Sequence, residues 1–238
     1  MNRILLIALF TSFSLFSQHK SVVVLELFTS QGCSSCPPAD IVLKKINDNM
    51  DSEYVIPIAY HVDYWNYIGW KDPFSTKEFT DIQRYYGQKF RSNSIYTPQL
   101  VINGNEHVVG SNEVTIHKKI KRYLKKSSNF KLDISETIKE ENGFTISFNI
   151  NGKVNNSILE ALIVLDEKTT NVKRGENRNR TIVNSNIAIA RTIKNINKTS
   201  GSIHIKRPKI ISKDDKLRLV LVLKDEDLTV QTATQIKL

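Results

Sequence analysis

The pattern of apolar and polar positions changes near the middle of the chain. In the first half, short apolar runs predict strands at 22–28, 54–62, 99–102 and 106–109. Segments of helical periodicity predict helices at 37–47, 75–90 and 113–124, the last capped by Asn112. Asn103-Gly104, between two apolar runs, is typical of a hairpin turn. The predicted order of elements is therefore βαβαββα.

The second half contains only strand-like runs separated by polar turns. These runs predict seven strands, at 130–134, 144–150, 159–165, 182–193, 203–205, 217–223 and 228–236. Several of them alternate with period two, and such a series is typical of an antiparallel β-sandwich of immunoglobulin-like architecture. All eight tyrosines and both tryptophans precede Lys125. The fold class predicted is α/β followed by β, with domains at 20–127 and 128–238.

The N-terminus has the features of an export signal. A positively charged start precedes thirteen uncharged residues from Ile4 to Phe16, a run too short to span a bilayer. We expect a signal peptide over residues 1–18, with cleavage between Ser17 and Lys20. No later stretch reaches transmembrane length, so the mature protein is expected to be secreted or periplasmic and not membrane-embedded.

The formal net charge of +10 is spread along the chain. The densest basic run, residues 117–126, places its charges at helical spacing, which favours a solvated helix face. Weak attraction to acidic surfaces stays open. A nucleic-acid partner is not expected for an exported protein.

The two cysteines of the chain, Cys33 and Cys36, lie between a predicted strand and a predicted helix. A CxxC pair at such a turn places two sulfurs within bonding distance, and the free N–H groups of the first helical turn stabilise a thiolate. Such a short loop restrains little unfolded-chain entropy, which argues against a purely structural bond. We interpret the pair as a redox-active disulfide and expect no other cofactor. Pro37 and Pro38 predict that the helix begins at Pro37, with Cys36 nearest its N-terminus.

The order of elements, with CxxC after the first strand and Thr97-Pro98 before the hairpin, resembles the thioredoxin-like fold in its minimal, glutaredoxin-sized form. The resemblance implies a cis Pro98 that faces the cysteines and leaves the backbone of Thr97 free to pair with a substrate strand. It also implies that Cys33 is the nucleophile and that Cys36 resolves the mixed disulfide.

Longer stretches resemble a family of secreted thioredoxin-like proteins, domain of unknown function 1223. They read VVLELFTSQGCSSCPPAD, AYHVDYWNYIGWKDPF, YTPQLVING and, in the second half, RGENRNRTI. The resemblance covers most of the mature chain. It implies a fold and a redox class but no substrate.

Glu26 interrupts an otherwise apolar strand seven residues before Cys33. The resemblance implies a buried acid beneath the disulfide, and Glu26 is the candidate to relay a proton to Cys36, with a pKa raised by burial. The alternative is a structural glutamate that lies in water or pairs with a lysine.

His61 and Asp63 follow the second strand, at the end of the sheet where the cysteines are expected. They are candidates to tune the thiol or contact substrate, with a purely structural histidine as the alternative. Trp65 and Trp70 are candidates for a peptide-binding wall, with core packing as the alternative. No metal site is predicted, although His61 with both cysteines would suit Cu(I) or Zn.

The charged loop Gly175–Arg180 is the last candidate. Glu176, with Arg178 or Arg180, is a candidate to latch the two domains together or to contact a partner. The alternative is a hairpin loop ordered by its own salt bridges. The sequence thus predicts an exported thiol–disulfide oxidoreductase whose partners are protein thiols or disulfides and an unidentified redox partner. The alternative is a non-catalytic binding protein, either a metal carrier or a module with an idle disulfide.

Overall fold

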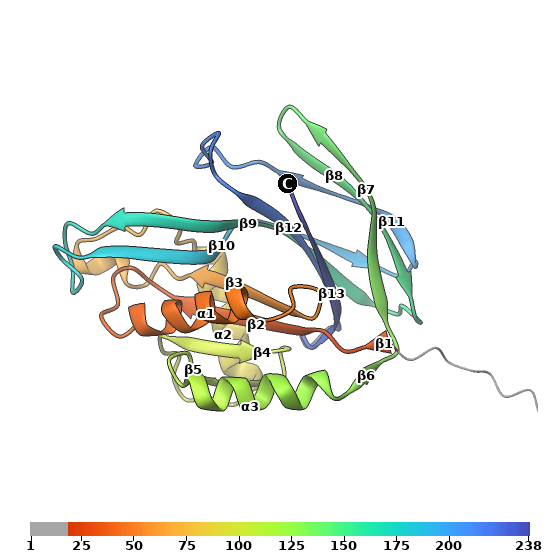
Figure 1. Cartoon of the computed structure of the whole chain (residues 1–238), viewed down its shortest axis with the longest axis horizontal. Coiled ribbons are helices and arrows are strands. Elements are labelled where there is room, and N and C mark those ends of the chain that lie inside the picture. The colour runs from red at the N-terminus through yellow and green to blue at the C-terminus, as the bar shows by residue number, and fades with distance from the viewer. Residues whose placement is uncertain (1–18) are drawn as a thin grey trace, which may run out of the picture.

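The computed structural model describes residues 19–238 and shows a mixed α/β fold rich in strands (Figure 1). The signal peptide predicted for residues 1–18 lies outside this range. Within residues 19–238 the strands form an eight-stranded sheet, a three-stranded sheet and a two-stranded pair. No helix in this part of the chain is long and apolar enough to cross a membrane.

The predicted elements are all present. The first half contains β1 (His19–Lys20), β2 (Val23–Thr29), α1 (Pro37–Asn49), β3 (Val55–His61), η1 (Asn66–Ile68), α2 (Lys77–Lys89), β4 (Gln99–Ile102), β5 (Glu106–Val109) and α3 (Glu113–Leu124). The second half contains β6 (Ser127–Ser128), β7 (Lys131–Glu140), β8 (Gly143–Asn151), β9 (Ser157–Asn171), β10 (Thr181–Ile196), β11 (Ser200–Lys206), β12 (Leu217–Lys224) and β13 (Val230–Lys237).

One sheet runs across the predicted domain boundary. Its strand order is β13-β12-β9-β10-β3-β2-β4-β5, and β10 adjoins β3 where Ile187 is the partner of Ala59. The apolar runs in β9 and β12 are buried on both faces, which fits the inner positions of these two strands in the sheet. Ile163 and Leu219 face one hydrophobic core and Leu162 and Val220 face another. Strands of this kind belong at the centre of a sheet that is covered on both sides.

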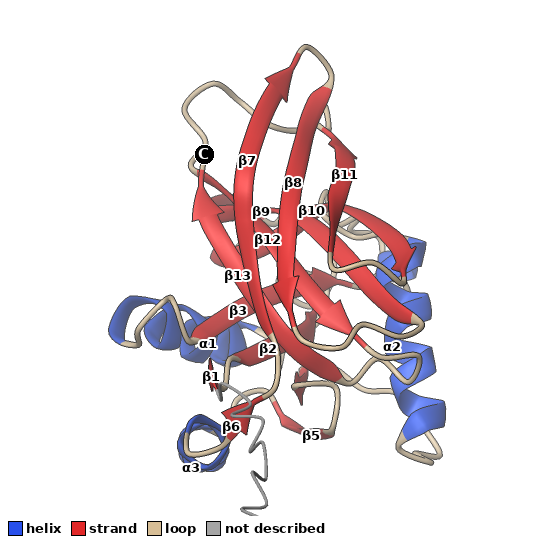
Figure 2. Cartoon of the chain, turned by 90° about the vertical axis from the view of Figure 1, so that its right-hand side faces the viewer, coloured by secondary structure: helices blue, strands red, loops and turns tan. Residues whose placement is uncertain are grey.

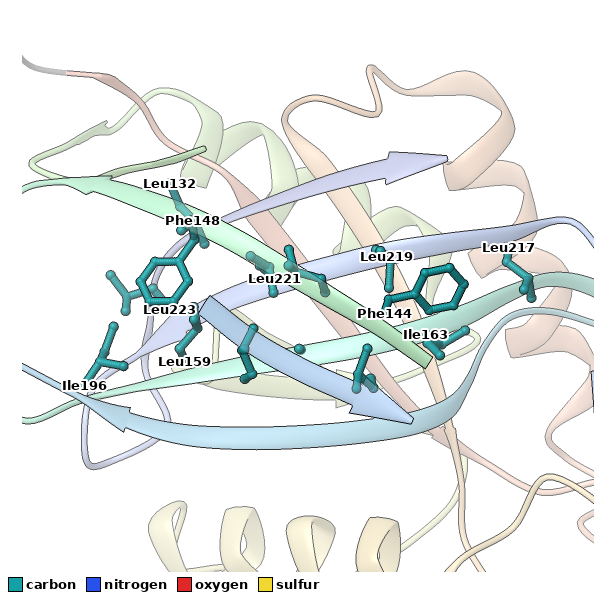
Figure 3. Close-up of a cluster of buried hydrophobic side chains, with 14 of the residues drawn as sticks. Leu132, Phe144, Phe148, Leu159, Ile163, Ile196, Leu217, Leu219, Leu221 and Leu223 are labelled. Atoms are coloured by element: carbon teal, nitrogen blue, oxygen red, sulfur yellow. The ribbon is translucent and has the colours of Figure 1, made fainter. Parts of the chain in front are cut away.

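The three-stranded sheet, in the order β11-β8-β7, completes a β-sandwich in the second half (Figure 2). It covers the face of the large sheet formed by β9, β10, β12 and β13. Figure 3 shows Phe144 and Phe148 of β8 among Leu219, Leu221 and Leu223 of β12. One layer of the sandwich is therefore shared with the first half of the chain, so the sandwich does not consist of two sheets of its own.

The first half of the large sheet is covered by helices on both faces. Leu25 and Leu27 of β2 belong to the core beneath α1 and α3, whereas Val24 and Phe28 belong to the core beneath α2. Alternate residues of β2 therefore face opposite sides of the sheet. The face to which a β2 residue points decides whether it lies near α1, which follows the cysteines.

The Asn103-Gly104 turn joins β4 to β5, as predicted. Both residues have positive φ, 49° and 65° respectively, which asparagine and glycine tolerate best. A Cβ atom at position 104 would lie 2.0 Å from the carbonyl oxygen of Leu228. Gly104 is thus needed both for the turn and for the close approach of the β12–β13 connection.

Candidate active site

The two cysteines lie in the turn between β2 and α1. Cys36 is the N-cap residue of α1, which begins at Pro37 as the two prolines predict. Its carbonyl oxygen accepts hydrogen bonds from the N–H groups of Ala39, at 2.8 Å, and Asp40, at 3.2 Å. Both cysteines are free thiols, and Cys33 is only 1% exposed although Ser34 and Ser35 are exposed.

The two thiols differ sharply in acidity. Hydrogen bonds from Cys36, Ser35 and Thr97 lower the pKa of the Cys33 thiol to about 6, and they outweigh the burial that opposes them. Burial, followed by the hydrogen bond to Cys33 and the negative charges of Cys33 and Asp40, raises the pKa of Cys36 well above its ordinary value. At neutral pH the pair therefore favours a Cys33 thiolate that accepts a hydrogen bond from a protonated Cys36.

Thr97 and Pro98 bring a second segment to Cys33. The Cys33 sulfur lies 3.9 Å from the Thr97 carbonyl oxygen and 3.2 Å from the Ser35 hydroxyl, and the Thr97–Pro98 peptide bond is cis. The indole N–H of Trp65 donates to the Thr97 hydroxyl at 2.8 Å. Of the predicted substrate-binding residues, Thr97 and Trp65 thus lie together next to the Cys33 sulfur.

Asp40 is the buried acid near Cys36, and the sequence analysis did not select it. It lies four residues after Cys36 and therefore on the same side of α1. One carboxylate oxygen accepts from the Thr29 hydroxyl at 3.2 Å, and the other has no partner among the described residues. Burial raises the pKa of Asp40 to about 7, partly offset by His61 and Thr29. The i, i+4 spacing from Cys36 is the signal that identifies it.

Glu26 does not lie with the cysteines. It is on the β2 face toward α2, opposite the face that carries Leu25 and Leu27 beneath α1. Its carboxylate pairs with the Lys224 ammonium at 2.7 Å and accepts from the Tyr86 hydroxyl at 2.6 Å. The prediction that Glu26 relays a proton to Cys36 is therefore wrong, because strand alternation directs it into a buried ion network.

His61 and Asp63 are both held by partners other than the cysteines. The Nδ1 atom of His61 lies 2.7 Å from a carboxylate oxygen of Asp72, and both side chains are buried. Burial lowers the pKa of His61, but the charge and hydrogen bond of Asp72, together with the charge of Asp40, outweigh burial and raise the pKa overall. Asp63 accepts from the Thr80 hydroxyl of α2 at 2.6 Å. His61 adds positive charge near Asp40, whereas Asp63 anchors α2.

Trp70 and Gln31 form a polar hub behind the cysteine turn. The Trp70 indole N–H donates to the Gln31 side-chain oxygen at 3.1 Å. The Gln31 amide group donates in turn to Thr170 of β9, at 3.0 Å, and to Asn184 of β10, at 2.9 Å. Trp70 therefore holds the Gln31 side chain in place, and Gln31 links the cysteine turn to β9 and β10 in the second half of the chain.

The β9–β10 hairpin tip, residues 172–180, contacts the cysteine turn directly. The Ser34 N–H donates to the Glu176 carboxylate at 2.9 Å. The buried Asn177 side chain donates to the carbonyl oxygens of Gln31, at 2.9 Å, and Cys33, at 2.8 Å. The latch interpretation of this loop is confirmed, although its principal contacts come from Glu176 and Asn177, since Arg180 reaches Asn177 at 3.0 Å and not the cysteine turn.

No group of three or more histidine, cysteine or acidic side chains suited to a metal ion occurs within residues 19–238. The alternative set of Cys33, Cys36 and His61 is thus not assembled in this part of the chain.

Comparison with known proteins places the chain in a family. The model of a family described as "Protein of unknown function (DUF1223)" matches residues 24–224. The chain belongs to the DUF1223 family. No curated protein sequence matches it.

Two solved structures are similar to this DUF1223 protein over most of its length. One is protein AGR_C_4864 of Agrobacterium tumefaciens, at 25% identity and a TM-score of 0.64, with 93% of this chain and 96% of that chain covered. The other is HBP35 of Porphyromonas gingivalis, at 18% identity and a TM-score of 0.66, with 92% of this chain and 76% of that chain covered. The second likeness concerns the fold alone.

The arrangement around Cys33 in this DUF1223 protein suits exchange chemistry at sulfur. It combines an acidic thiol, a neighbouring thiol that retains its proton and a buried carboxyl group with a pKa near neutrality. These are the groups that form and resolve a mixed disulfide.

Proposed function

We propose that this protein is an exported thiol–disulfide oxidoreductase that exchanges disulfides with protein substrates through Cys33 and Cys36. The observation that carries the proposal is the opposite acidity of two adjacent thiols. The pKa of Cys33 is lowered to about 6, whereas that of Cys36 is raised. A purely structural pair has no need of such a difference, but a nucleophile and a resolving thiol depend on it.

We also propose that residues 20–127 form a thioredoxin-like unit. The element order βαβαββα and the local strand order β3-β2-β4-β5 support this, with helices on both faces of the sheet. The position of the cysteines between β2 and α1, with the cis Thr97–Pro98 bond directly before β4, is a second support. A fold assignment alone would not establish redox activity, so the chemistry is argued from the thiols.

In the reducing direction, the Cys33 thiolate attacks one sulfur of a substrate disulfide. The substrate S–S bond breaks, a mixed disulfide forms with Cys33, and the departing substrate thiolate takes up a proton. Cys36 then loses its proton and attacks the Cys33 sulfur, which releases the second substrate thiol. Two electrons pass from the Cys33–Cys36 dithiol to the substrate, and the reverse sequence oxidises a substrate dithiol.

Asp40 is the group that accepts the Cys36 proton. Cys36 has to ionise before it attacks, although burial keeps its pKa high. Asp40 lies one helical turn away with a pKa of about 7, so at neutral pH about half of its population is ready to take a proton. Its approach to Cys36 is direct or through a water molecule, since one carboxylate oxygen has no partner within residues 19–238.

In the dithiol form the Cys33 side chain is only 1% exposed, so its sulfur is shielded from solvent and substrate. Substrate therefore has to displace part of this cover before attack, and the exposed Ser34 and Ser35 mark the nearest approach. Thr97 lies next to the Cys33 sulfur, and Trp65 holds its hydroxyl in place. The backbone of Thr97 is therefore the part of the protein that a substrate strand would meet beside Cys33.

Export, and with it a secreted or periplasmic location, is part of the proposal. It is supported by the charged start and the uncharged run from Ile4 to Phe16. In such a compartment the partners are protein thiols or disulfides, together with a second redox protein that restores Cys33 and Cys36 after each turnover.

The proposal is tested with the purified protein and hydroxyethyl disulfide, a small neutral substrate. The reduced Cys36→Ser variant is expected to accumulate a mixed disulfide on Cys33, whereas the Cys33→Ser variant is expected to form none. The wild-type protein is expected to end as the internal disulfide. Mass spectrometry separates these products, and an unmodified Cys33 in the Cys36→Ser variant would refute the proposal.

A further inference from the structure

We infer that an open groove beside the cysteine turn docks acidic segments of substrate proteins, an inference that deepens the proposed function and rests on it. The groove has a volume of about 870 Å³ and is lined by Ile68, Lys173, Arg174, Gly175, Glu176 and Arg178. We call it the basic groove, because its three cationic side chains are all exposed.

The basic groove adjoins the reactive turn. Its Glu176 carboxylate accepts a hydrogen bond of 2.9 Å from the N–H of Ser34, one of the two serines between the cysteines. The next residue, Asn177, donates to the Cys33 carbonyl oxygen at 2.8 Å. A peptide lying in the groove therefore brings its neighbouring residues to the covered Cys33 sulfur.

The groove is formed before any partner arrives. Gly175 has a φ of 76°, and a Cβ atom there would lie 3.0 Å from the Ile68 side chain of η1. The hairpin tip thus packs closely on η1, and Ile68 supplies apolar surface between the charged side chains. A preformed groove avoids much of the ordering cost that weakens binding to flexible loops.

The charges of the groove select an anionic partner. Lys173, Arg174 and Arg178 form no ion pair within residues 19–238, and residues 1–18 contain no aspartate or glutamate. The one carboxylate of the groove, that of Glu176, is already engaged by a backbone N–H. Three unpaired cations beside a nucleophile attract a segment with acidic residues near its disulfide and repel a basic one.

Docking is tested separately from chemistry with two short peptides that carry serine in place of both cysteines, one flanked by aspartates and the other by lysines. We expect the full-length protein to bind the aspartate peptide at least about tenfold more tightly at low salt, with a preference that salt weakens. Lys173→Gln, Arg174→Gln and Arg178→Gln together are expected to abolish the preference.

The matched control changes three exposed lysines that are likewise unpaired within the described residues, Lys118 and Lys121 of α3 and Lys125 directly after it. Their replacement by glutamine removes the same charge and is expected to keep the preference. Equal binding of the two peptides, or equal loss of preference in both triple variants, would overturn the inference. Turnover of hydroxyethyl disulfide is measured in parallel, so that a failure of exchange chemistry is recognised separately from a failure of docking.

Discussion

The side-chain amide of Asn177 donates a hydrogen bond of 2.8 Å to the carbonyl oxygen of Cys33. The two residues are 144 positions apart in the chain, and a second bond of 2.9 Å from the same amide holds the carbonyl of Gln31. The second half of the protein thus holds the backbone at Cys33 in place. The β9–β10 hairpin tip is therefore part of the candidate site.

Replacing Asn177 is expected to disturb Cys33 in a way that depends on the new side chain. Asn177→Ala leaves two carbonyl groups without their donor and is expected to cost about 1–3 kcal/mol of unfolding free energy, measured by urea denaturation. Asn177→Asp adds a negative charge beside the turn and is expected to raise the pKa of Cys33 as well, measured by alkylation against pH. Equal Cys33 reactivity in the wild-type and Asn177→Asp proteins would contradict a positioning role.

Asp40→Asn is expected to slow the resolving step and spare the attacking step. Without the carboxylate, the proton of Cys36 has no acceptor, so release of a preformed mixed disulfide on Cys33 should slow by about 10²-fold. Rapid mixing with mass-spectrometric detection measures both steps. Glu26→Gln is the control, because Glu26 lies in the ion network on the other face of the sheet, and it should leave the resolving rate unchanged. If both variants resolve at the wild-type rate, Asp40 is not the proton acceptor.

Asp40 also makes stability depend on pH. Burial raises its pKa from 3.8 to about 7, so between about pH 4 and 7 the folded state binds more protons than the unfolded state. The folded state is therefore favoured while Asp40 is protonated. This stabilisation is complete below about pH 4 and is lost as the pH rises to about 7. At pH 8 the Asp40→Asn variant should be more stable than wild type, by up to about 4 kcal/mol. Urea unfolding at pH 4 and pH 8 measures this, and an equal difference at the two values would be inconsistent with a buried, titrating Asp40.

Lys224 balances two buried carboxylates. Its ammonium group lies 2.7 Å from Glu26 and 2.7 Å from Glu160, and all three side chains are about 1% exposed or less. Lys224→Met leaves the buried Glu26 carboxylate without a cationic partner, whereas Glu160 keeps Arg191, and is expected to cost about 3–5 kcal/mol of unfolding free energy. Lys44→Met removes an exposed pair with Glu167 and should cost less than about 1 kcal/mol. Similar losses in both variants would contradict a larger contribution to stability from the buried network than from the exposed pair.

Sequence reasoning succeeded where local chemistry decides the structure. Pro37 and Pro38 can stand only in the first turn of a helix, and α1 begins there. Asn103 and Gly104 both tolerate positive φ, and the β4–β5 turn uses it. Asn112 caps α3 by accepting from the Thr115 N–H at 3.1 Å. In each case a few residues adjacent in the chain determine the helix end or the turn.

The shared sheet depends on longer-range information. The runs Leu159–Leu165 and Leu217–Leu223 are buried without interruption, which indicates strands covered on both faces. If these runs are taken as strands of a sandwich with one face in solvent, their place at the centre of a larger sheet is missed. No local feature of the sequence shows that β10 adjoins β3. The contacts of Asn177 are equally remote from their partners along the chain.

At the candidate site some residues could be predicted from the sequence and others could not. The cysteine pair and Thr97 come together, because a strand–turn–helix and the segment before β4 fix them locally. Glu26 does not join them, because strand alternation sets it on the β2 face opposite α1. Asp40 was overlooked, although its i, i+4 spacing from Cys36 places both residues on one side of the helix.

The most direct test is the rate at which iodoacetamide alkylates Cys33 in the reduced protein as a function of pH. The chain has only two cysteines, so peptide mass spectrometry assigns each product. We predict a midpoint at about pH 6, the pKa to which Cys36, Ser35 and Thr97 lower the thiol. Cys36→Ala, which removes the largest of these contributions, should move the midpoint toward the value of about 8.5 for a free thiol. A wild-type midpoint near 8.5, unchanged in Cys36→Ala, would contradict the account.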